Sequence, residues 1–200
     1  MLNTPNGAPG PRIDVYSSKV PEPKDVVLVP QPILRTASKI LEKFKGGIAA
    51  KWAIGGDAGE VMLGVNVTPE HIEIITTKEG CEEIVKALAE YQPSAPVMVE
   101  REHPRKAEID GAMLPVYTRS YYSELRIDGV KVEVHGDEQI KVGEWDWGDP
   151  LDFKPEYAYI AAGKLPLVPL TLKSELDIGL GWLDRVKLIS DAVLQKHHSH

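Results

Sequence analysis

The feature that most constrains the fold is a short apolar segment that ends in two glycines and leads into a brief helix. Residues 49–54, AAKWAI, predict a buried strand that stops at Gly55 and Gly56. The following residues, DAGEVMLG, predict a short helix with Asp57 at or near its N-cap. A strand, a glycine turn and a helix in this order indicate an α/β domain with a tight turn at one edge of its sheet.

Polar side chains alternate with apolar ones on two predicted strands. In EHIEIIT, His71 and Glu73 project from the face opposite the isoleucines. In YYSELRIDGVKVEVHG, an Asp-Gly dipeptide favours a type I′ hairpin, and Glu133 shares the polar face of the second run with Lys131 and His135. These side chains either form a cluster that could hold a metal or lie on the solvated face of a half-exposed sheet.

The rest of the chain follows helical and loop patterns. Apolar residues at helical spacing predict a helix over residues 32–44, and a capping box beginning at Thr76 predicts another. PVMVE indicates a strand, and GEWDWGDPLDF indicates a loop. The last segment predicts two helices, with Thr171 as the candidate N-cap and a break near residues 179–181.

Length and charge limit the possible classes of protein. At 200 residues with 42% hydrophobic content, the chain can build one substantial domain or two small ones. We expect a disordered tail over residues 1–12, an α/β domain over 13–165 and a C-terminal helical segment over 166–200 packed on it. The net charge of −7 argues against a broad nucleic-acid surface.

The compartment is predicted from what the sequence lacks. A single cysteine, Cys81, cannot form an intramolecular disulfide and fits a small, semi-buried helix residue. No apolar run approaches the roughly 18 residues of a membrane span, and the first residues do not resemble a signal peptide. These features predict a cytoplasmic protein with no membrane contact.

The glycine turn, the short helix and the alternating strand together resemble the nucleotidyltransferase superfamily of polymerase-beta-like enzymes. In that family a Gly-Gly or Gly-Ser turn precedes a strand bearing Asp-x-Asp, and a third Asp lies on a later strand, which LRIDGVKVEVHGD resembles. The C-terminal LPLVPLTLKSELDIGLGWLDRVKLISDAV resembles the tail of small prokaryotic members, including abortive-infection-toxin-like ones. The resemblance covers residues 34–192. It implies an α+β fold with a mixed sheet, flanking helices and a C-terminal helical segment.

The acidic triad of the family is altered in this chain. His71 stands at the first Asp position, Glu73 at the second and Glu133 at the third. Glutamate is one methylene longer than aspartate, which disturbs strict octahedral Mg²⁺ geometry, and imidazole is a better ligand for Mn²⁺ or Zn²⁺ than for Mg²⁺. Either the metal differs from that of the family or catalysis is impaired.

The resemblance implies the transfer of a nucleoside monophosphate from a nucleoside triphosphate to an acceptor, with Mg²⁺ or Mn²⁺ as cofactor. Glu73 and Glu133 would be catalytic, and together with His71 they would hold the metal. Gly55, Gly56 and Asp57 would bind the nucleotide, although Asp57 also fits a helix cap.

The acceptor could be a protein, an RNA or a small molecule, and a second copy or a protein partner could dock on the WDW loop or the C-terminal helices. Two alternatives stay open. One is a catalytically degraded member that binds nucleotide or a partner, and the other is an unrelated interaction domain.

Overall fold

The computed structural model describes residues 27–198, so the predicted tail over residues 1–12 lies outside the described part of the chain. The helices are α1 (Gln31–Phe44), α2 (Gly56–Met62), α3 (Lys78–Ala87), α4 (Leu170–Gly179) and α5 (Leu183–His198). The strands are β1 (Trp52–Gly55), β2 (His71–Thr76), β3 (Val97–Glu102), β4 (Ala107–Ile109), β5 (Ala112–Leu114), β6 (Val116–Ile127), β7 (Val130–Val142), β8 (Glu156–Ile160) and β9 (Gly163–Leu167).

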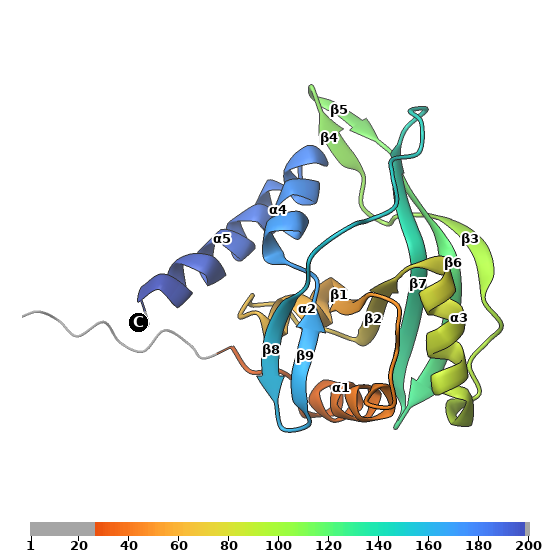
Figure 1. The fold of residues 1–200 in the computed structure, drawn as a ribbon. Helices are drawn as coiled ribbons and strands as arrows, with labels where there is room; N and C mark the ends of the chain where they lie inside the picture. The colour runs from red at the N-terminus through yellow and green to blue at the C-terminus, as the bar shows by residue number, and fades with distance from the viewer. Residues whose placement is uncertain (1–26, 199–200) are drawn as a thin grey trace, which may run out of the picture.

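Seven of these strands form one mixed sheet. Its order is β3-β6-β7-β2-β1-β9-β8, and β4 and β5 form a separate hairpin (Figure 1). The pairs β2 with β7 and β1 with β9 are parallel, and the other neighbours in the sheet are antiparallel. This α+β architecture with flanking helices confirms the predicted fold class.

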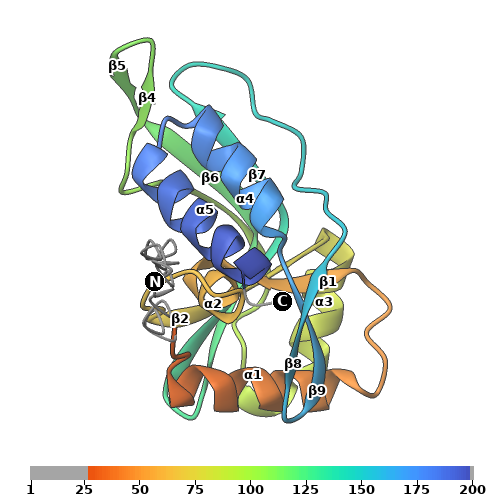
Figure 2. The same ribbon diagram turned by 90° about the vertical axis from the view of Figure 1, so that its left-hand side faces the viewer.

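The main core lies on one face of the sheet. Ile72 and Ile74 of β2 and Val132 and Val134 of β7 are fully buried, and they belong to one apolar cluster with residues of α1 and α3. The helices α4 and α5 lie over β6 and β7 from the other side, as the two views in Figures 1 and 2 show. The sheet therefore has one sealed face and one face that carries the polar side chains of β2 and β7.

Local sequence signals account for several element boundaries. The predicted helix over residues 32–44 is confirmed as α1, and the predicted break near residues 179–181 is confirmed between α4 and α5. Asp128 and Gly129 have φ values of 51° and 84°, as the predicted type I′ hairpin between β6 and β7 requires. The segment 145–155 contains no helix or strand, as its prolines and glycines indicate.

Three predicted helix caps are wrong: Asp57 does not cap α2, whose N-cap is Gly55, and neither Thr76 nor Thr171 caps a helix. The N-cap of α3 is Thr77 rather than Thr76, and its side chain accepts a hydrogen bond from the Gly80 N–H at 3.1 Å. Thr76 still belongs to β2, where its hydroxyl donates to the Lys51 carbonyl at 2.7 Å. Thr171 lies inside α4, whose N-cap is Pro169. Each threonine can cap a helix, and the position of the backbone decides which one does.

Four strands were not predicted from the sequence: β4, β5, β8 and β9. The strands β8 and β9 extend the sheet beyond β1, and β9 ends at Leu167, just before α4 begins at Leu170. β9 contains Pro166, a residue that argues against a strand in the middle of a sheet. None of the helices in residues 27–198 combines the length and the apolar character that crossing a membrane requires.

Candidate active site

The structure brings together the three side chains predicted to hold a metal. β2 runs parallel to β7 with Glu73 directly opposite Glu133, so both carboxylates leave the same face of the sheet. His71 Nε2 lies 3.0 Å from Glu73 Oε1 and 3.5 Å from Glu133 Oε2. One possible ligand atom from each residue lies within 4.8 Å of the other two. These side chains therefore form a cluster rather than a dispersed polar surface.

The predicted glycine turn lies against this cluster. Gly56 has a φ of +55°, and a Cβ at this position would lie 2.7 Å from the Glu73 carboxylate. A Cβ at Gly55 would lie 2.8 Å from the side chain of Ile75. Glycine is therefore required at both positions for the bend to pass close to β2. At Gly56 the absent side chain leaves room for the carboxylate itself.

Asp57 takes part in a different contact. It is the second residue of α2, and no side chain caps this helix. Its Oδ1 accepts a hydrogen bond from Arg185 of α5 at 2.8 Å, and the same guanidinium contacts Glu60 Oε2 at 2.5 Å. Asp57 therefore links α2 to α5 at the rim of a second cavity, beside Gly56.

Glu133 is held by several cationic and polar groups. Lys131 Nζ donates to Glu133 Oε1 at 2.5 Å, and the Tyr122 hydroxyl donates to the same oxygen at 2.8 Å. Arg101 Nη1 lies 3.9 Å from Oε1, and His135 Nε2 lies 3.4 Å from Oε2. The Oε2 atom, which faces both histidines, is the oxygen left for a further ligand.

These contacts shift the pKa values of the cluster. Burial alone would raise the pKa of Glu133, but the hydrogen bonds from His135, Lys131 and Tyr122 hold it well below its usual value. Burial would also raise the pKa of Glu73, but the hydrogen bond with His71 outweighs it and lowers the carboxyl pKa. The hydrogen bond to Glu73 raises the pKa of His71. Both carboxylates are therefore ionised at neutral pH.

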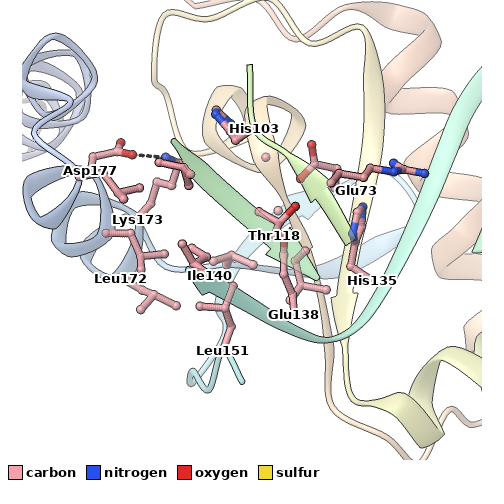
Figure 3. Close-up of a pocket in the computed structure, with 18 of the residues that line it drawn as sticks. Glu73, His103, Thr118, His135, Glu138, Ile140, Leu151, Leu172, Lys173 and Asp177 are labelled. Carbon is pink, nitrogen blue, oxygen red and sulfur yellow. Dashed lines mark hydrogen bonds and ion pairs between the residues drawn. The ribbon is translucent and has the colours of Figure 1, made fainter. Parts of the chain in front are cut away.

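Two adjoining cavities open on the cluster. The first, of about 350 Å³, extends from Glu73 and Glu133 toward α4 (Figure 3). The second, of about 590 Å³, extends from His71 and Glu73 toward Asp57 and Arg185. Both touch Gly56 and Glu73, so the cluster lies where the two cavities meet.

Several residues of this site could not be singled out from the sequence. Arg101 of β3 lies over the Tyr122 ring at 3.9 Å and faces Glu133. Lys173 lines both cavities from α4. These contacts depend on the pairing register between β3 and β6 and on the path of α4. The local sequence pattern predicts neither the register nor the path.

Comparison with solved structures shows which folds the chain resembles. The chain aligns over 84% of its length with 96% of the crystal structure of a proposed nucleotidyltransferase from Thermotoga maritima, at 24% identity and a TM-score of 0.61. The lincosamide antibiotic adenylyltransferase LnuA with bound lincomycin aligns over 82% of this chain and 98% of its own, at 13% identity and a TM-score of 0.45. ANT(2'')-Ia in complex with adenylyl-2''-tobramycin aligns over 80% and 88%, at 10% identity and a TM-score of 0.43. No family model and no curated protein sequence matches the chain. The described part of the chain has the nucleotidyltransferase fold.

Proposed function

We propose that this protein transfers a nucleoside monophosphate from a nucleoside triphosphate to an acceptor hydroxyl, with a divalent cation held by His71, Glu73 and Glu133. The observation that carries the proposal is the convergence of these three side chains at the junction of two cavities, beside a glycine bend. The fold supports the reaction class, and the cluster supplies the residues for the chemistry.

The two distances from the His71 nitrogen fit those between ligands of one divalent cation. Tetrahedral ligands about 2.1 Å from Zn²⁺ lie about 3.4 Å from one another. The nitrogen of His71 lies 3.0 and 3.5 Å from the nearest oxygens of Glu73 and Glu133. One imidazole with two carboxylates suits Mn²⁺ or Zn²⁺ better than Mg²⁺. When bound, such an ion would neutralise negative charge on the phosphates during transfer.

The chain's own groups would position the nucleotide. The larger cavity, beside Gly56 and Asp57, has a volume within the range of about 300–1,000 Å³ typical of small-molecule sites. Arg185 and Arg105 line it, and each is held by acidic partners, Arg185 by Asp57 and Glu60 and Arg105 by Asp184. Their guanidinium groups would contact the triphosphate from positions that these ion pairs fix.

The first test measures thermal unfolding with ATP, GTP, CTP or UTP in the presence of Mn²⁺, Zn²⁺ or Mg²⁺, together with turnover of the α-labelled nucleotide. A ligand at one hundred times its Kd stabilises the folded state by about 2.7 kcal/mol. We expect one nucleotide with Mn²⁺ or Zn²⁺ to raise the midpoint, and Glu73→Gln and Glu133→Gln to abolish turnover. Glu79→Gln, an exposed position on α3, is the matched control and should behave as the natural chain does.

A second experiment changes the choice of metal. His71→Asp replaces the imidazole by a carboxylate, a ligand that Mg²⁺ prefers. We expect this variant to bind Mg²⁺ at least tenfold more tightly than the natural chain, as measured by calorimetric titration. Unchanged Mg²⁺ affinity would mean that the cluster does not act as a cation site.

A second candidate function is nucleotide binding without turnover. It is favoured by the position of Lys131, whose ammonium already neutralises Glu133. The two candidates separate in the first experiment. Nucleotide-dependent stabilisation with no labelled product, across all four nucleotides and all three metals, supports the binding protein.

A further inference from the structure

We propose that the cavity of about 350 Å³ is the acceptor site, that it takes a small uncharged molecule with an apolar body and a hydroxyl group, and that Glu138 accepts the proton of that hydroxyl. This inference rests on the proposed nucleotidyl transfer and names the acceptor class that the reaction would use.

The walls of this cavity are mainly aliphatic and aromatic. They include Ile140, Leu151, Leu172, Leu176, Leu180 and Trp182. Figure 3 shows Leu172 and Lys173 of α4 on one side, with the sheet residues His135 and Glu138 on the other. The volume lies near the lower end of the range for small-molecule sites, about 300–1,000 Å³. Such a space suits one compact molecule with an apolar body.

The charges in the α4 wall are already paired. Lys173 forms an ion pair with Asp177 four residues along the helix, and the Asp177 side chain is fully buried. The pair therefore adds no net charge to the cavity. An uncharged apolar body would pack against this wall without separating the buried ion pair.

A β-bulge aims Glu138 into the cavity. Strict alternation after Glu133 and His135 would place Asp137 next on the same face. Instead, β7 places Gly136 opposite Tyr121 and Gln139 opposite Arg119, so two residues of β7 face the single residue Ser120. Asp137 is one of these two residues, and its φ of 50° lets the backbone accommodate the additional residue. As a result Glu138, and not Asp137, lines the cavity beyond His135.

Glu138 is available for a ligand. Among the described residues its carboxylate has no hydrogen-bond or ion-pair partner, in contrast to Glu73 and Glu133. Burial raises the pKa of Glu138, and the neighbouring charges of Glu73 and Glu133 raise it further, whereas His135 lowers it. A carboxylate with a raised pKa is a stronger base than an exposed one, as proton abstraction from a hydroxyl requires.

The reaction balances with these groups. The hydroxyl oxygen of the acceptor forms a bond to the α-phosphorus of the nucleotide, while the bond from that phosphorus to the bridging oxygen breaks. Pyrophosphate leaves with the electron pair of the broken bond, and the hydroxyl proton goes to Glu138. No oxidant or reductant is needed.

The binding experiment uses 2-naphthalenemethanol, an uncharged alcohol with an apolar body, titrated calorimetrically against the full chain. We expect saturable binding by the natural protein and by Ile178→Arg, since Ile178 is 57% exposed on the outer side of α4. Leu176→Arg fills the cavity from the same helix and should weaken binding at least tenfold. Absence of binding by the natural protein, or equal loss in both variants, overturns the inference.

The second experiment follows transfer of label from α-labelled ATP, with Mn²⁺, to 2-naphthalenemethanol. Glu138→Gln should lower kcat about 100-fold or more, the effect of losing a general base, with the KM for ATP changed less than threefold. Asp137→Asn is the matched control, because asparagine tolerates the same left-handed backbone and the residue does not line the cavity. Equal kcat values for Glu138→Gln and the natural chain would contradict the role of Glu138.

Binding of ATP with Mn²⁺ is measured separately by thermal unfolding. If ATP binds but the alcohol is neither bound nor modified, only the acceptor assignment fails. If ATP does not bind, the proposed nucleotidyl transfer fails first. Labelling of added RNA or of a polypeptide in place of the alcohol would also overturn the assignment of a small-molecule acceptor.

Discussion

At the scale of single residues, the site depends on the space left by Gly56. Its backbone is left-handed, and a Cβ at this position would lie only 2.7 Å from the Glu73 carboxylate. A side chain there would therefore displace one of the proposed metal ligands. The glycine has a steric role in addition to its conformational one.

Gly56→Ala is expected to lower the free energy of unfolding by about 1–2 kcal/mol, the cost of a left-handed non-glycine residue, and to weaken Mn²⁺ binding at least tenfold. Gly64→Ala is the matched control, since Gly64 also has a positive φ, but a Cβ there would meet nothing within 4 Å. It should show the stability loss without the metal effect. Urea unfolding and calorimetric Mn²⁺ titration measure the two quantities. Equal Mn²⁺ affinity in the two variants would contradict the steric role.

Cys81 provides a test of the core that does not involve the site. The side chain is fully buried on α3, and burial raises the pKa of its thiol to about 11 from the ordinary 9.0. This shift leaves about 100-fold less thiolate at pH 8, and the thiolate is the reactive form. We expect the native thiol to react with a disulfide reagent at least 100-fold more slowly than the thiol of the unfolded chain. Comparable rates would show that α3 is not packed as described.

At the scale of elements, the sequence predicts on which face of a regular strand a side chain lies. It does not predict where a β-bulge interrupts that alternation. Alternation correctly places His71, Glu73 and Glu133 on the face opposite the buried Ile72 and Ile74, because a regular strand has a fixed period of two. The same rule fails after His135, because the bulge places Glu138 on this face where regular alternation would place Asp137. A bulge depends on pairing with a partner strand, which the sequence of one strand does not contain.

The contact between α2 and α5 carries a prediction at this scale. Arg185 is the partner of Glu60, which is 4% exposed, and burial already raises the pKa of that carboxyl. Arg185→Met leaves this carboxylate buried without its cation, at a cost of about 3–5 kcal/mol at pH 7. A carboxyl whose pKa is raised in the folded state still holds its proton at pH values at which the unfolded chain has lost it. The free energy of unfolding therefore falls as pH rises through this range. Part of the loss should therefore be recovered at pH 5.

Urea unfolding of the natural chain and of the variant at both pH values measures this effect. Arg105→Met is the control, since Arg105 pairs with the exposed Asp184 and its loss should leave stability close to that of the natural protein. A loss in Arg185→Met that is the same at pH 5 and pH 7 would contradict the role assigned to Glu60.

At the scale of the whole molecule, the two cavities are built from segments far apart in the chain. The bend after β1, the polar face of β2 and β7, the loop at His103 and Pro104, and α4 all contribute to their walls. The sequence alone located the bend and the polar strands. It did not locate α4 opposite them, because that placement depends on β8 and β9, which carry the chain back across the sheet before the last two helices.

The measurement that tests the central claim most directly is calorimetric titration of Mn²⁺ into the natural chain and into His71→Ala, Glu73→Gln and Glu133→Gln, with Glu79→Gln as control. The structure predicts one cation bound per chain, with affinity reduced at least tenfold in each of the three variants and retained in the control. Equal affinity in all five proteins, or no binding by the natural chain, would contradict a cation site at this cluster.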